Sequence, residues 1–466
     1  MTQASLRQSG IQQASERLIA ILRDACNSQS EPATETASIL RFETSVDTCN
    51  PLAWLAAHNG QPAIYWRDRD GICETAGLEV ADVITVSESV DFSRVMSDIH
   101  ARLRNATGTV RYFGGFRFDA PHGSDNCHEA WQPFGTARFV LPRFELTRNQ
   151  AGWKLACNVL SDEMNRESVD KIALLLENVA STSAQVSLQN SAFGKRHDNP
   201  GKEQWNRTIQ SALDMLAEGQ TSKIVLARQS GMEFTSQLNP WVLLQRLRDA
   251  SVRCSLFGIQ PDRQTACIGA TPERLYRRNG NLIESEAVAG TRPRGDNEAH
   301  DIELQNALCH SDKDIREHRF VVDSLRDSLE TFCSKLNMSN GPEILKLASV
   351  QHLRTTFSGQ LKEGIGDAEL LASLHPTPAV GGYPKENARR EISRLEHFDR
   401  GWYSGPIGWV STNAAEFAVA IRSGLVHNNR LTLFSGAGIV EGSTPDNEWD
   451  EIETKMSHFL KAVTDS

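Results

Sequence analysis

The sequence of 466 residues predicts an α+β protein in which antiparallel hairpins are interspersed with helices. Short apolar runs alternate with turn residues, which is typical of strands joined by tight turns. Segments with helical spacing lie between groups of strands rather than after every strand, as they would in a doubly wound sheet. No internal repeat or low-complexity tract interrupts this pattern.

The first part of the chain begins with apolar side chains at helical spacing, which predict an amphipathic helix over residues 1–30. Apolar runs bounded by turn residues follow from about 38 to 160 and predict strands of an antiparallel sheet. Examples of these strands are residues 63–66, 111–113 and 137–141. A further helix is predicted at residues 172–180.

A polar stretch at residues 187–203 contains both Gly and Pro and is the best candidate for a boundary. The length alone suggests roughly two or three domains or one large domain. We therefore divide the chain into residues 1–200 and residues 201–464.

The second part begins with a predicted helix at residues 204–217, for which Gly219 is a plausible C-cap. Asn239 and Pro240 suit the N-cap and N1 positions of a helix that runs to about Ala250. Strands are predicted at residues 223–228, 254–260, 265–270, 274–278 and 282–289. Further helices are predicted within 300–336 and at 384–395, and a last strand pair at 417–426 and 431–435.

Composition favours a globular enzyme or binding protein that acts on a small molecule. Hydrophobic residues make up 39% and charged residues 23% of the chain, which is ordinary for a protein with a sizeable core. The net charge of -10 disfavours nucleic acid and anionic membranes as partners. An anionic substrate would need a local patch of Arg, Lys or metal.

The nine cysteines are scattered and odd in number, and no CxxC pair occurs, so neither a disulfide framework nor a zinc site is expected. The polar N-terminus lacks the apolar segment of a signal peptide. No apolar run approaches the ~20 residues that a membrane helix needs. These features predict a cytoplasmic protein.

The stretch 435–455 combines small residues with an acidic run. We expect Gly436, Ala437 and Gly438 to form a turn whose N–H groups receive an anion. If Asp446 or Asn447 caps a helix there, the following carboxylates Glu448 and Glu451 share one helix face. The alternative is purely structural: such acids complement a helix dipole, and Gly-x-Gly often turns a hairpin.

Two residues could carry proton transfer. Lys223 begins an apolar strand and either extends to water or, if desolvated near other cations, acts as a base in its neutral form. Glu273 follows a strand and a Thr-Pro turn, where burial could make it a general acid. The alternative for Glu273 is an ion pair with Arg274 or Arg277.

Glu317 lies on a predicted helix, where it is either an i,i+4 partner on a solvated face or a ligand opposite Glu448 and Glu451. Carboxylates without Cys or clustered His favour a hard cation, and Mg²⁺ is the best candidate. His375 and Arg422, the latter on a late strand, could contact a bound acid. The residues by themselves indicate a metal-assisted acid–base enzyme for a small carboxylate, and a non-catalytic binding domain stays open.

Taken together, residues 202–464 resemble the chorismate-utilising enzymes, and within them the isochorismate synthases. The motifs that carry the resemblance are KIVLAR (223–228), GATPERL (269–275), AGTRPRG (289–295), LHPTPAVGG (374–382), FDRGWYSGPIGW (398–409), GAGIV (436–440) and NEWDEIETK (447–455). Residues 1–200 resemble the variable N-terminal part of the same fold, with FGGFRFD (113–119) as the most recognisable piece.

The resemblance implies an αββα-type fold of two stacked, largely antiparallel sheets flanked by helices, with one Mg²⁺-dependent site between them. By matching motifs, Lys223 is the general base and Glu273 the general acid. The metal would be held by Glu317 and Glu448, with Glu451 supporting its waters. Positions that match substrate-binding residues are Gly290, Thr291, His375, Arg422, Ala437, Gly438 and Lys455.

The reaction implied is isomerisation of chorismate to isochorismate, in which water adds at ring C2 and the C4 hydroxyl leaves. Relatives that add ammonia typically carry Gln at the position of Lys223, and the aminodeoxychorismate synthases carry Lys at the position of Ala289. No glutamine amidotransferase partner is therefore expected, and we expect a monomer. The alternative is a salicylate synthase, which goes on to eliminate pyruvate. A catalytically inactive ligand sensor would have lost acid, base or metal carboxylates, and all are present.

The product of an isochorismate synthase can enter menaquinone, siderophore or salicylate synthesis, and these residues do not distinguish the three.

Overall fold

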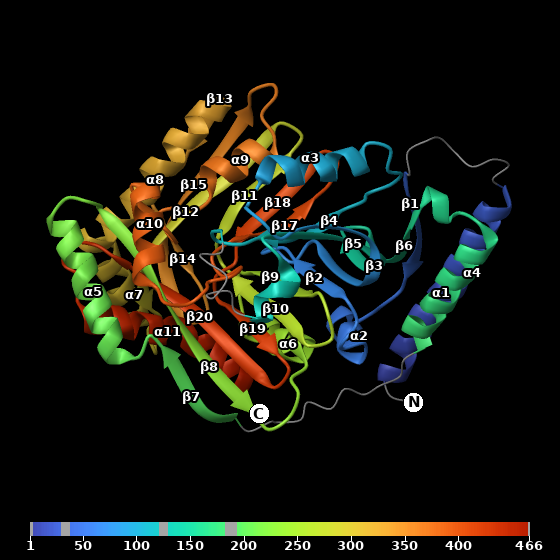
Figure 1. The fold of residues 1–466 in the computed structure, drawn as a ribbon, viewed down its shortest axis with the longest axis horizontal. Helices are drawn as coiled ribbons and strands as arrows, with labels where there is room; N and C mark the ends of the chain where they lie inside the picture. The colour runs from blue at the N-terminus through green and yellow to red at the C-terminus, as the bar shows by residue number, and fades with distance from the viewer. Residues whose placement is uncertain (1–2, 29–37, 121–128, 182–192, 465–466) are drawn as a thin grey trace.

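The computed structural model describes residues 3–28, 38–120, 129–181 and 193–464 (Figure 1). Its helices are α1 (Gln3–Ser28), α2 (Pro51–Ala57), α3 (Phe92–Leu103), α4 (Arg166–Ser181), α5 (Lys202–Ala217), α6 (Pro240–Ala250), α7 (Glu298–Cys309), α8 (Asp312–Phe332), α9 (Asp367–Leu374), α10 (Lys385–Leu395) and α11 (Pro445–Thr464).

Strands from both parts of the chain join one hydrogen-bonded system, in which neighbouring strands run antiparallel. The first part contributes β1 (Ile39–Val46), β2 (Ala63–Arg67), β3 (Glu74–Val86), β4 (Tyr112–Phe116), β5 (Ala137–Asn149), β6 (Gly152–Leu160) and β7 (Phe193–Asn199). The second contributes β8 (Lys223–Phe234), β9 (Ser255–Gln260), β10 (Thr265–Thr271), β11 (Arg274–Asn279), β12 (Leu282–Pro293), β13 (Cys333–Met338), β14 (Glu343–Lys346), β15 (Val350–Leu361), β16 (Gly382–Tyr383), β17 (Pro406–Val410), β18 (Ala414–Val419), β19 (Ser423–His427) and β20 (Arg430–Ile439).

The strand system divides into two arms at β5, because the two edges of this long strand pair with different strands. One side of β5 pairs with β3, and the first arm continues through β2, β9, β10, β19, β20 and β8. The other side pairs with β6 near its end and with β4 near its start. From β4 the second arm continues through β17, β18, β11, β12 and β15.

The two arms pack face to face around an aromatic cluster. Trp66, Phe257 and Phe434 enter it from the first arm, and Phe113 and Trp409 enter it from the second. Since apolar side chains from both arms are buried in this cluster, the arms form the two inner layers of the molecule.

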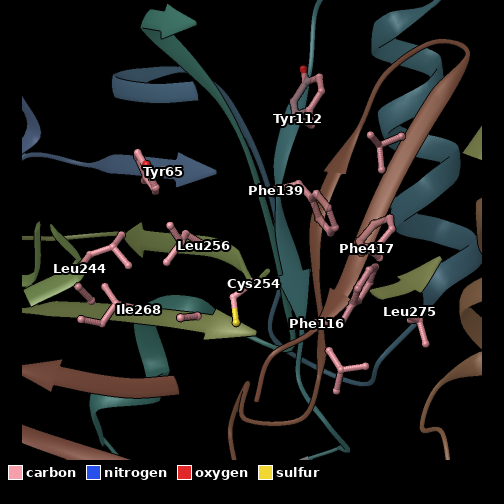
Figure 2. Packing of buried hydrophobic residues seen from close by; sticks show 14 of the residues in the cluster. Tyr65, Tyr112, Phe116, Phe139, Leu244, Cys254, Leu256, Ile268, Leu275 and Phe417 are labelled. Atoms are coloured by element: carbon pink, nitrogen blue, oxygen red, sulfur yellow. The ribbon is translucent and has the colours of Figure 1, made fainter. Parts of the chain in front are cut away.

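The outer faces of the arms are covered by helices. Leu244 of α6 packs with Leu256 and Ile268 of the first arm in a second apolar cluster (Figure 2). The rings of Phe139 and Phe417, from β5 and β18, also belong to it and lie 6.2 Å apart between centroids. Helix α11 packs against β20, and α8 packs against β12, so these two helices flank opposite sides of the region where the arms meet.

Most of the predicted elements of the second part are confirmed. The strands at residues 223–228, 254–260, 265–270, 274–278 and 282–289 correspond to β8 to β12. Asn239 is the N-cap of α6, where its side chain accepts a hydrogen bond from the Trp241 amide at 3.1 Å, and Pro240 occupies the first helical position.

The prediction of a single strand at residues 417–426 is wrong, because the strand breaks within this segment. Two strands, β18 and β19, occupy it, and Arg422 between them has a φ of 50°. This left-handed conformation turns the chain out of the strand, so Arg422 is not on a strand as expected.

Two other boundaries differ from the prediction. Helix α11 is capped by Thr444, whose Oγ1 accepts from the Asn447 amide at 3.4 Å, rather than by Asp446 or Asn447. Pro445 fits the first helical position and moves the start of the helix toward the N-terminus. Residues 333–336 are not helical but begin β13, which pairs with β15.

The candidate boundary at residues 187–203 is only partly described, because residues 187–192 lie outside the described ranges. Residues 193–199 form β7 and pair with β8, and α5 begins at Lys202. The division at residue 200 therefore stays a prediction, although both parts contribute strands to the same arms.

Candidate active site

A cavity lies where β8, β12, β20, α8 and α11 meet, and encloses about 800 Å³ free of protein atoms, open solvent included. Six of the residues singled out in the sequence line it: Glu273, Gly290, Thr291, Glu317, Arg422 and Lys455. Ala289 also lines it, at the position where a lysine would mark a different chemistry.

Glu273 occupies the short turn between β10 and β11 and is 4% exposed. Thr377 donates its hydroxyl to Glu273 Oε1 at 3.2 Å. Burial, reinforced by the charge of Glu286, raises the pKa of Glu273 to about 7, against the opposing effects of Thr377 and two lysines. The alternative ion pair with Arg274 is wrong, since Arg274 donates to Glu416 at 3.0 Å. Glu273 thus has the environment of a carboxyl that keeps its proton near neutral pH.

Lys223 is the first residue of β8, and its side chain is completely buried. It does not extend to water: its Nζ donates to Glu317 Oε1 at 3.0 Å. Lys223 does not line the cavity. It lies directly behind Glu317, and Glu317 does line the cavity. This contact with a carboxylate differs from the expected cationic surroundings.

Glu317 does not lie on a solvated helix face, because only 15% of its side chain is exposed. Burial would raise the pKa of Glu317, but the charges of Lys223 and Lys455 outweigh it and lower that pKa. Lys455 itself donates to the Gly436 carbonyl at 2.9 Å and pairs with Glu451 at 2.8 Å. Glu317 is therefore an anion held by lysines at the edge of the cavity.

The expected anion-receiving turn at Gly436, Ala437 and Gly438 is wrong, because all three residues are in strand β20 and pair with β8. The glycines serve another purpose. A Cβ at Gly438 would come within 2.6 Å of Glu317 Oε1 and 3.0 Å of Lys223 Cε. Gly438 therefore makes room for the pair formed by these two side chains, while Gly436 lines the cavity.

Gly290 forms a bulge in β12, where the register with β15 shifts between Ala289 and Thr291. Its φ of 74° suits glycine, and this conformation directs its carbonyl to His352 Nδ1 at 3.0 Å. His352 in turn accepts a hydrogen bond from Arg422 Nη2 at 2.9 Å through Nε2. Burial and the neighbouring guanidinium lower the pKa of His352 to about 3, so the ring is neutral and fixes the orientation of Arg422.

The sequence reasoning missed His352, Tyr403 and Thr377. His352 is on β15, where no motif distinguishes a histidine from a core residue. Tyr403 and Thr377 belong to motifs quoted above, but their side chains were not assigned a role. Tyr403 lines the cavity and stacks on Phe434 with ring centroids 5.4 Å apart.

His375 does not line the cavity, so the contact with a bound acid expected from its motif finds no support in its position. Its Nε2–H donates to the Phe118 carbonyl at 2.8 Å, and its ring packs edge-on against Phe92 and Phe118. Burial lowers the pKa of His375 to about 3, as expected of a neutral core histidine. It is Thr377, two residues on, that reaches Glu273.

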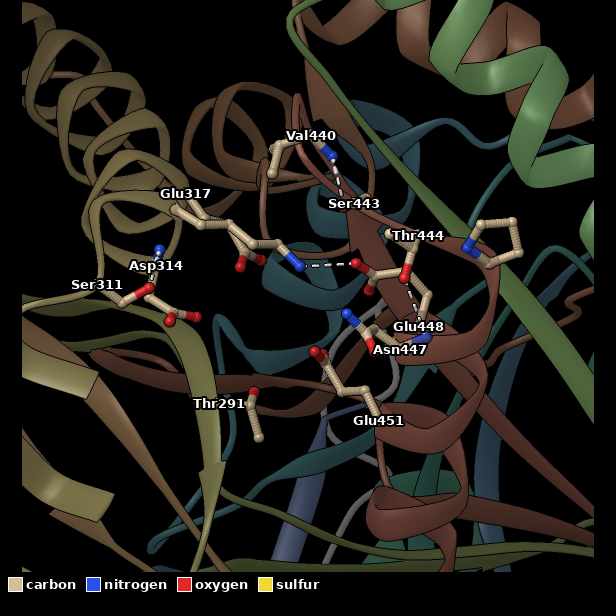
Figure 3. A network of polar contacts seen from close by, with 12 residues as sticks. Thr291, Ser311, Asp314, Glu317, Val440, Ser443, Thr444, Asn447, Glu448 and Glu451 are labelled. Carbon is tan, nitrogen blue, oxygen red and sulfur yellow. Dashed lines mark hydrogen bonds and ion pairs between the residues drawn. The ribbon is translucent and has the colours of Figure 1, made fainter. Parts of the chain in front are cut away.

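The expected metal ligands Glu317, Glu448 and Glu451 direct their carboxyl groups toward one space from α8 and α11 (Figure 3). Lys313 donates to Glu448 Oε1 at 2.7 Å. Each of the three carboxylates thus has a lysine partner, and no ready-made cluster of three metal-ligating side chains occurs within the described ranges.

The donor chemistry nevertheless fits a hard cation. Glu448 Oε2 is buried without a hydrogen-bond partner among the described residues, and burial together with the charge of Glu451 raises the pKa of Glu448. A cation placed among these oxygens would coordinate Glu448 Oε2 and offset the repulsion between the Glu448 and Glu451 carboxylates.

Comparison with known proteins places the chain in a family. A family model described as "Chorismate binding enzyme" matches residues 24–464, so the chain belongs to the chorismate binding enzymes. Isochorismate synthase MenF of Pasteurella multocida is 32% identical over 432 residues, which cover 91% of this chain and 93% of that protein. Isochorismate synthase 2 of Arabidopsis thaliana is 32% identical over 97% of this chain and 84% of its own length.

A solved structure of MenF from Escherichia coli, described as the menaquinone-specific isochorismate synthase, has the same fold. The TM-score is 0.80 at 29% sequence identity, with 97% of this chain and 99% of that chain covered. This likeness confirms the expected αββα-type fold.

Two further expectations can be compared with the structure. No helix in the described part of the chain has both the length and the apolar character needed to cross a bilayer. The cysteines within the described ranges are free thiols.

Proposed function

We propose that the chain is an isochorismate synthase, an isomerase that converts chorismate to isochorismate. The observation that carries this proposal is a cavity lined by the buried carboxyl Glu273 and by Glu317, which pairs with the buried amine of Lys223. Similarity to isochorismate synthases over nearly the whole chain supports it. Ala289 in the lining leaves no amine nucleophile at that position.

Chorismate carries two carboxylates, which the site can receive although the protein is acidic overall. Arg422 and Lys455 supply positive charge in the lining, and Thr291 supplies a hydroxyl. His352 holds Arg422 in place, so its guanidinium is oriented before the substrate arrives.

The chemistry needs one proton taken and one given. Lys223, as a free amine, would accept a proton from the water whose oxygen bonds to ring C2. As the ring double bonds shift, the C4–O bond breaks and Glu273 donates its proton to the departing hydroxyl. Water is consumed and released, so the reaction is a net isomerisation. A base and an acid of this kind each contribute roughly 10²–10⁴-fold.

We propose Mg²⁺ as the cofactor, held by Glu317, Glu448 and Glu451. When bound, the ion supplies positive charge that offsets a substrate carboxylate and the Glu317 carboxylate beside Lys223. Glu317 would then face both the ion and the Lys223 amine.

The test is product analysis by chromatography after incubation of the purified chain with chorismate and Mg²⁺. Isochorismate as the product, without a matching release of pyruvate, supports the proposal. Stoichiometric pyruvate and salicylate would identify the alternative, a salicylate synthase that shares the same lysine. Unchanged chorismate would overturn both and favour a ligand-binding role.

Further proposals concern setting and partners. We propose a monomer that works in the cytosol without a glutamine amidotransferase, because water rather than ammonia is the nucleophile. The free thiols fit a reducing compartment. The net charge of -10 supports the proposal that neither nucleic acid nor an anionic membrane is a partner of this protein.

A further inference from the structure

The ion pair of Arg69 with Glu286 binds the backbone of the turn that carries Glu273. Arg69, in the connection between β2 and β3, donates through Nη1 to Glu286 Oε1 at 2.7 Å and to the Pro272 carbonyl at 3.2 Å. Glu286 Oε1 also accepts from the Arg274 backbone N–H at 3.0 Å. The residues immediately before and after Glu273 are therefore bound by the same pair.

Both members of the pair are buried, with 9% of the Arg69 side chain and 4% of the Glu286 side chain exposed. They line a second cavity, and none of its lining residues is shared with the cavity that Glu273 lines. The pair thus stands between the Glu273 turn and this second cavity. Removing Glu286 would leave the buried Arg69 guanidinium without its ion-pair partner, which is costly, whereas Glu286 also has Arg354 Nη1 at 3.9 Å from its Oε2.

The charges that face Glu273 come from three other elements. Lys223 of β8 and Lys455 of α11 favour the ionised carboxylate, and Glu286 of β12 opposes them. Arg69 compensates part of the Glu286 charge through the ion pair. Arg274 is engaged with Glu416 and points its charge elsewhere.

We propose that Arg69 and Glu286 are positioning residues for the general acid. Their ion pair fixes the Pro272–Arg274 turn so that the Glu273 carboxyl faces the substrate, and the Glu286 charge behind the turn keeps that carboxyl protonated. This inference rests on the proposed function, because it takes Glu273 as the acid of the reaction.

The first test is Glu286→Gln, which keeps an oxygen acceptor for Arg69 and for the Arg274 amide but removes the charge. The alkaline limb of the kcat/KM profile reports the acid and should move down by about one pH unit. The KM for chorismate should change less than about twofold, because the pair does not line the substrate cavity.

The second test is Arg69→Gln, which leaves only the Arg354 guanidinium, 3.9 Å from Glu286 Oε2, to compensate the Glu286 charge. The alkaline limb should then move up, and kcat should fall about tenfold because the Pro272 carbonyl loses its donor. Shifts of opposite sign in the two variants are not expected of a merely structural pair. Arg69→Lys keeps the charge without the planar guanidinium. It should lower kcat and leave the pH of the alkaline limb unchanged.

The matched control is Glu284→Gln on the same strand. Glu284 is 59% exposed and pairs with the Arg274 side chain at 3.6 Å, not with the backbone of the turn. Its profile should coincide with that of the wild type. Thermal unfolding of every variant shows whether the fold is intact, and the upward shift expected of Arg69→Gln carries the test if Glu286→Gln does not fold.

Two failures can be told apart. A wild-type protein that makes no isochorismate would overturn the proposed function itself. An active wild type whose alkaline limb is unmoved in both Glu286→Gln and Arg69→Gln would overturn only the positioning role.

Discussion

The Lys223 ammonium and the Glu317 carboxylate lie 3.0 Å apart, in contact beneath the candidate site. Sequence reasoning gave these residues separate roles, one as a base and one as a metal ligand. Their contact links the two roles, because a cation held by the Glu317 oxygens would lie beside the Lys223 amine.

Lys223→Ala should lower turnover at least 10²-fold, because it removes the amine that donates to Glu317 behind the cavity and a general base contributes that much. Chorismate binding, followed by calorimetry in the presence of Mg²⁺, should change little. Lys385→Ala is a suitable control, since Lys385 bonds to the backbone carbonyl of Ala372 away from the cavity. Near-normal turnover in Lys223→Ala would show that another group activates the water.

The pH dependence of activity should report Glu273. Because burial raises the pKa of Glu273 to about 7 and the acid must be protonated to donate, kcat/KM should fall as pH rises through about 7. Glu273→Gln should lower kcat by about 10²-fold or more and lose this alkaline limb. The measurement is a steady-state profile from pH 5.5 to 9, and a limb that persists in the variant would assign it to another group.

The same carboxyl should destabilise the fold at alkaline pH. Its pKa is raised from 4.5 to about 7 on folding, so between these values the folded state binds more protons and stability falls as pH rises. Glu273→Gln should therefore be more stable than wild type at pH 8, by about 1–3 kcal/mol, and equal to it near pH 4.5. Urea unfolding at the two pH values measures the difference.

A contrasting variant for this stability test is Glu396→Gln. Glu396 forms a buried ion pair with Arg400 at 2.6 Å, with 5% and 4% of the two side chains exposed. Its removal leaves a buried guanidinium without its anion and should lower stability at both pH values. A Glu273→Gln variant that is less stable at pH 8 would contradict the buried, protonated carboxyl.

Glu448→Gln should weaken Mg²⁺ binding about tenfold or more, because it replaces a carboxylate, whose Oε2 has no hydrogen-bond partner among the described residues, with a neutral amide that offers one oxygen. Calorimetric titration with Mg²⁺ alone measures this independently of turnover, and the Mg²⁺ dependence of the rate should shift in parallel. Glu441→Gln, an exposed carboxylate paired with Arg316, is the control. An unchanged titration would remove Glu448 from the metal site.

Gly438→Ala should preserve the fold but reduce turnover by about tenfold or more. The added methyl would meet the flexible ends of Glu317 and Lys223, so these side chains rather than the backbone must move. Gly194→Ala, also in a strand, is the matched control, since its Cβ would meet nothing closer than 3.8 Å. Equal activity of the two alanine variants would show that the pair tolerates displacement.

Sequence reasoning was most successful where local chemistry decides structure. The Asn239–Pro240 start of α6 and the hairpin turn at Asn279 and Gly280 follow from capping and turn preferences that need no tertiary information. The break at Arg422 could not be predicted in this way. An arginine with positive φ is uncommon, and it is held here by the strands on either side and by His352.

The candidate site was predicted by motif and not by contact. Glu273 and Glu317 line the cavity as expected, but nothing local distinguishes His375, which turned away, from Thr377, which reaches Glu273. The lysine partners of the carboxylates also depend on helices far apart in sequence, as in the pair of Lys313 on α8 with Glu448 on α11. Such pairs are visible only once the chain is folded.

The sharing of β5 by both arms bears on any attempt to isolate the catalytic half. A fragment that starts at residue 201 would lack β2 and β4, and so would leave β9 and β17 with bare backbone edges. It would also lack Arg69. The N-terminal part thus completes both arms of the sheet. Co-expression of the two separated parts, rather than truncation, is the way to ask whether they reassemble.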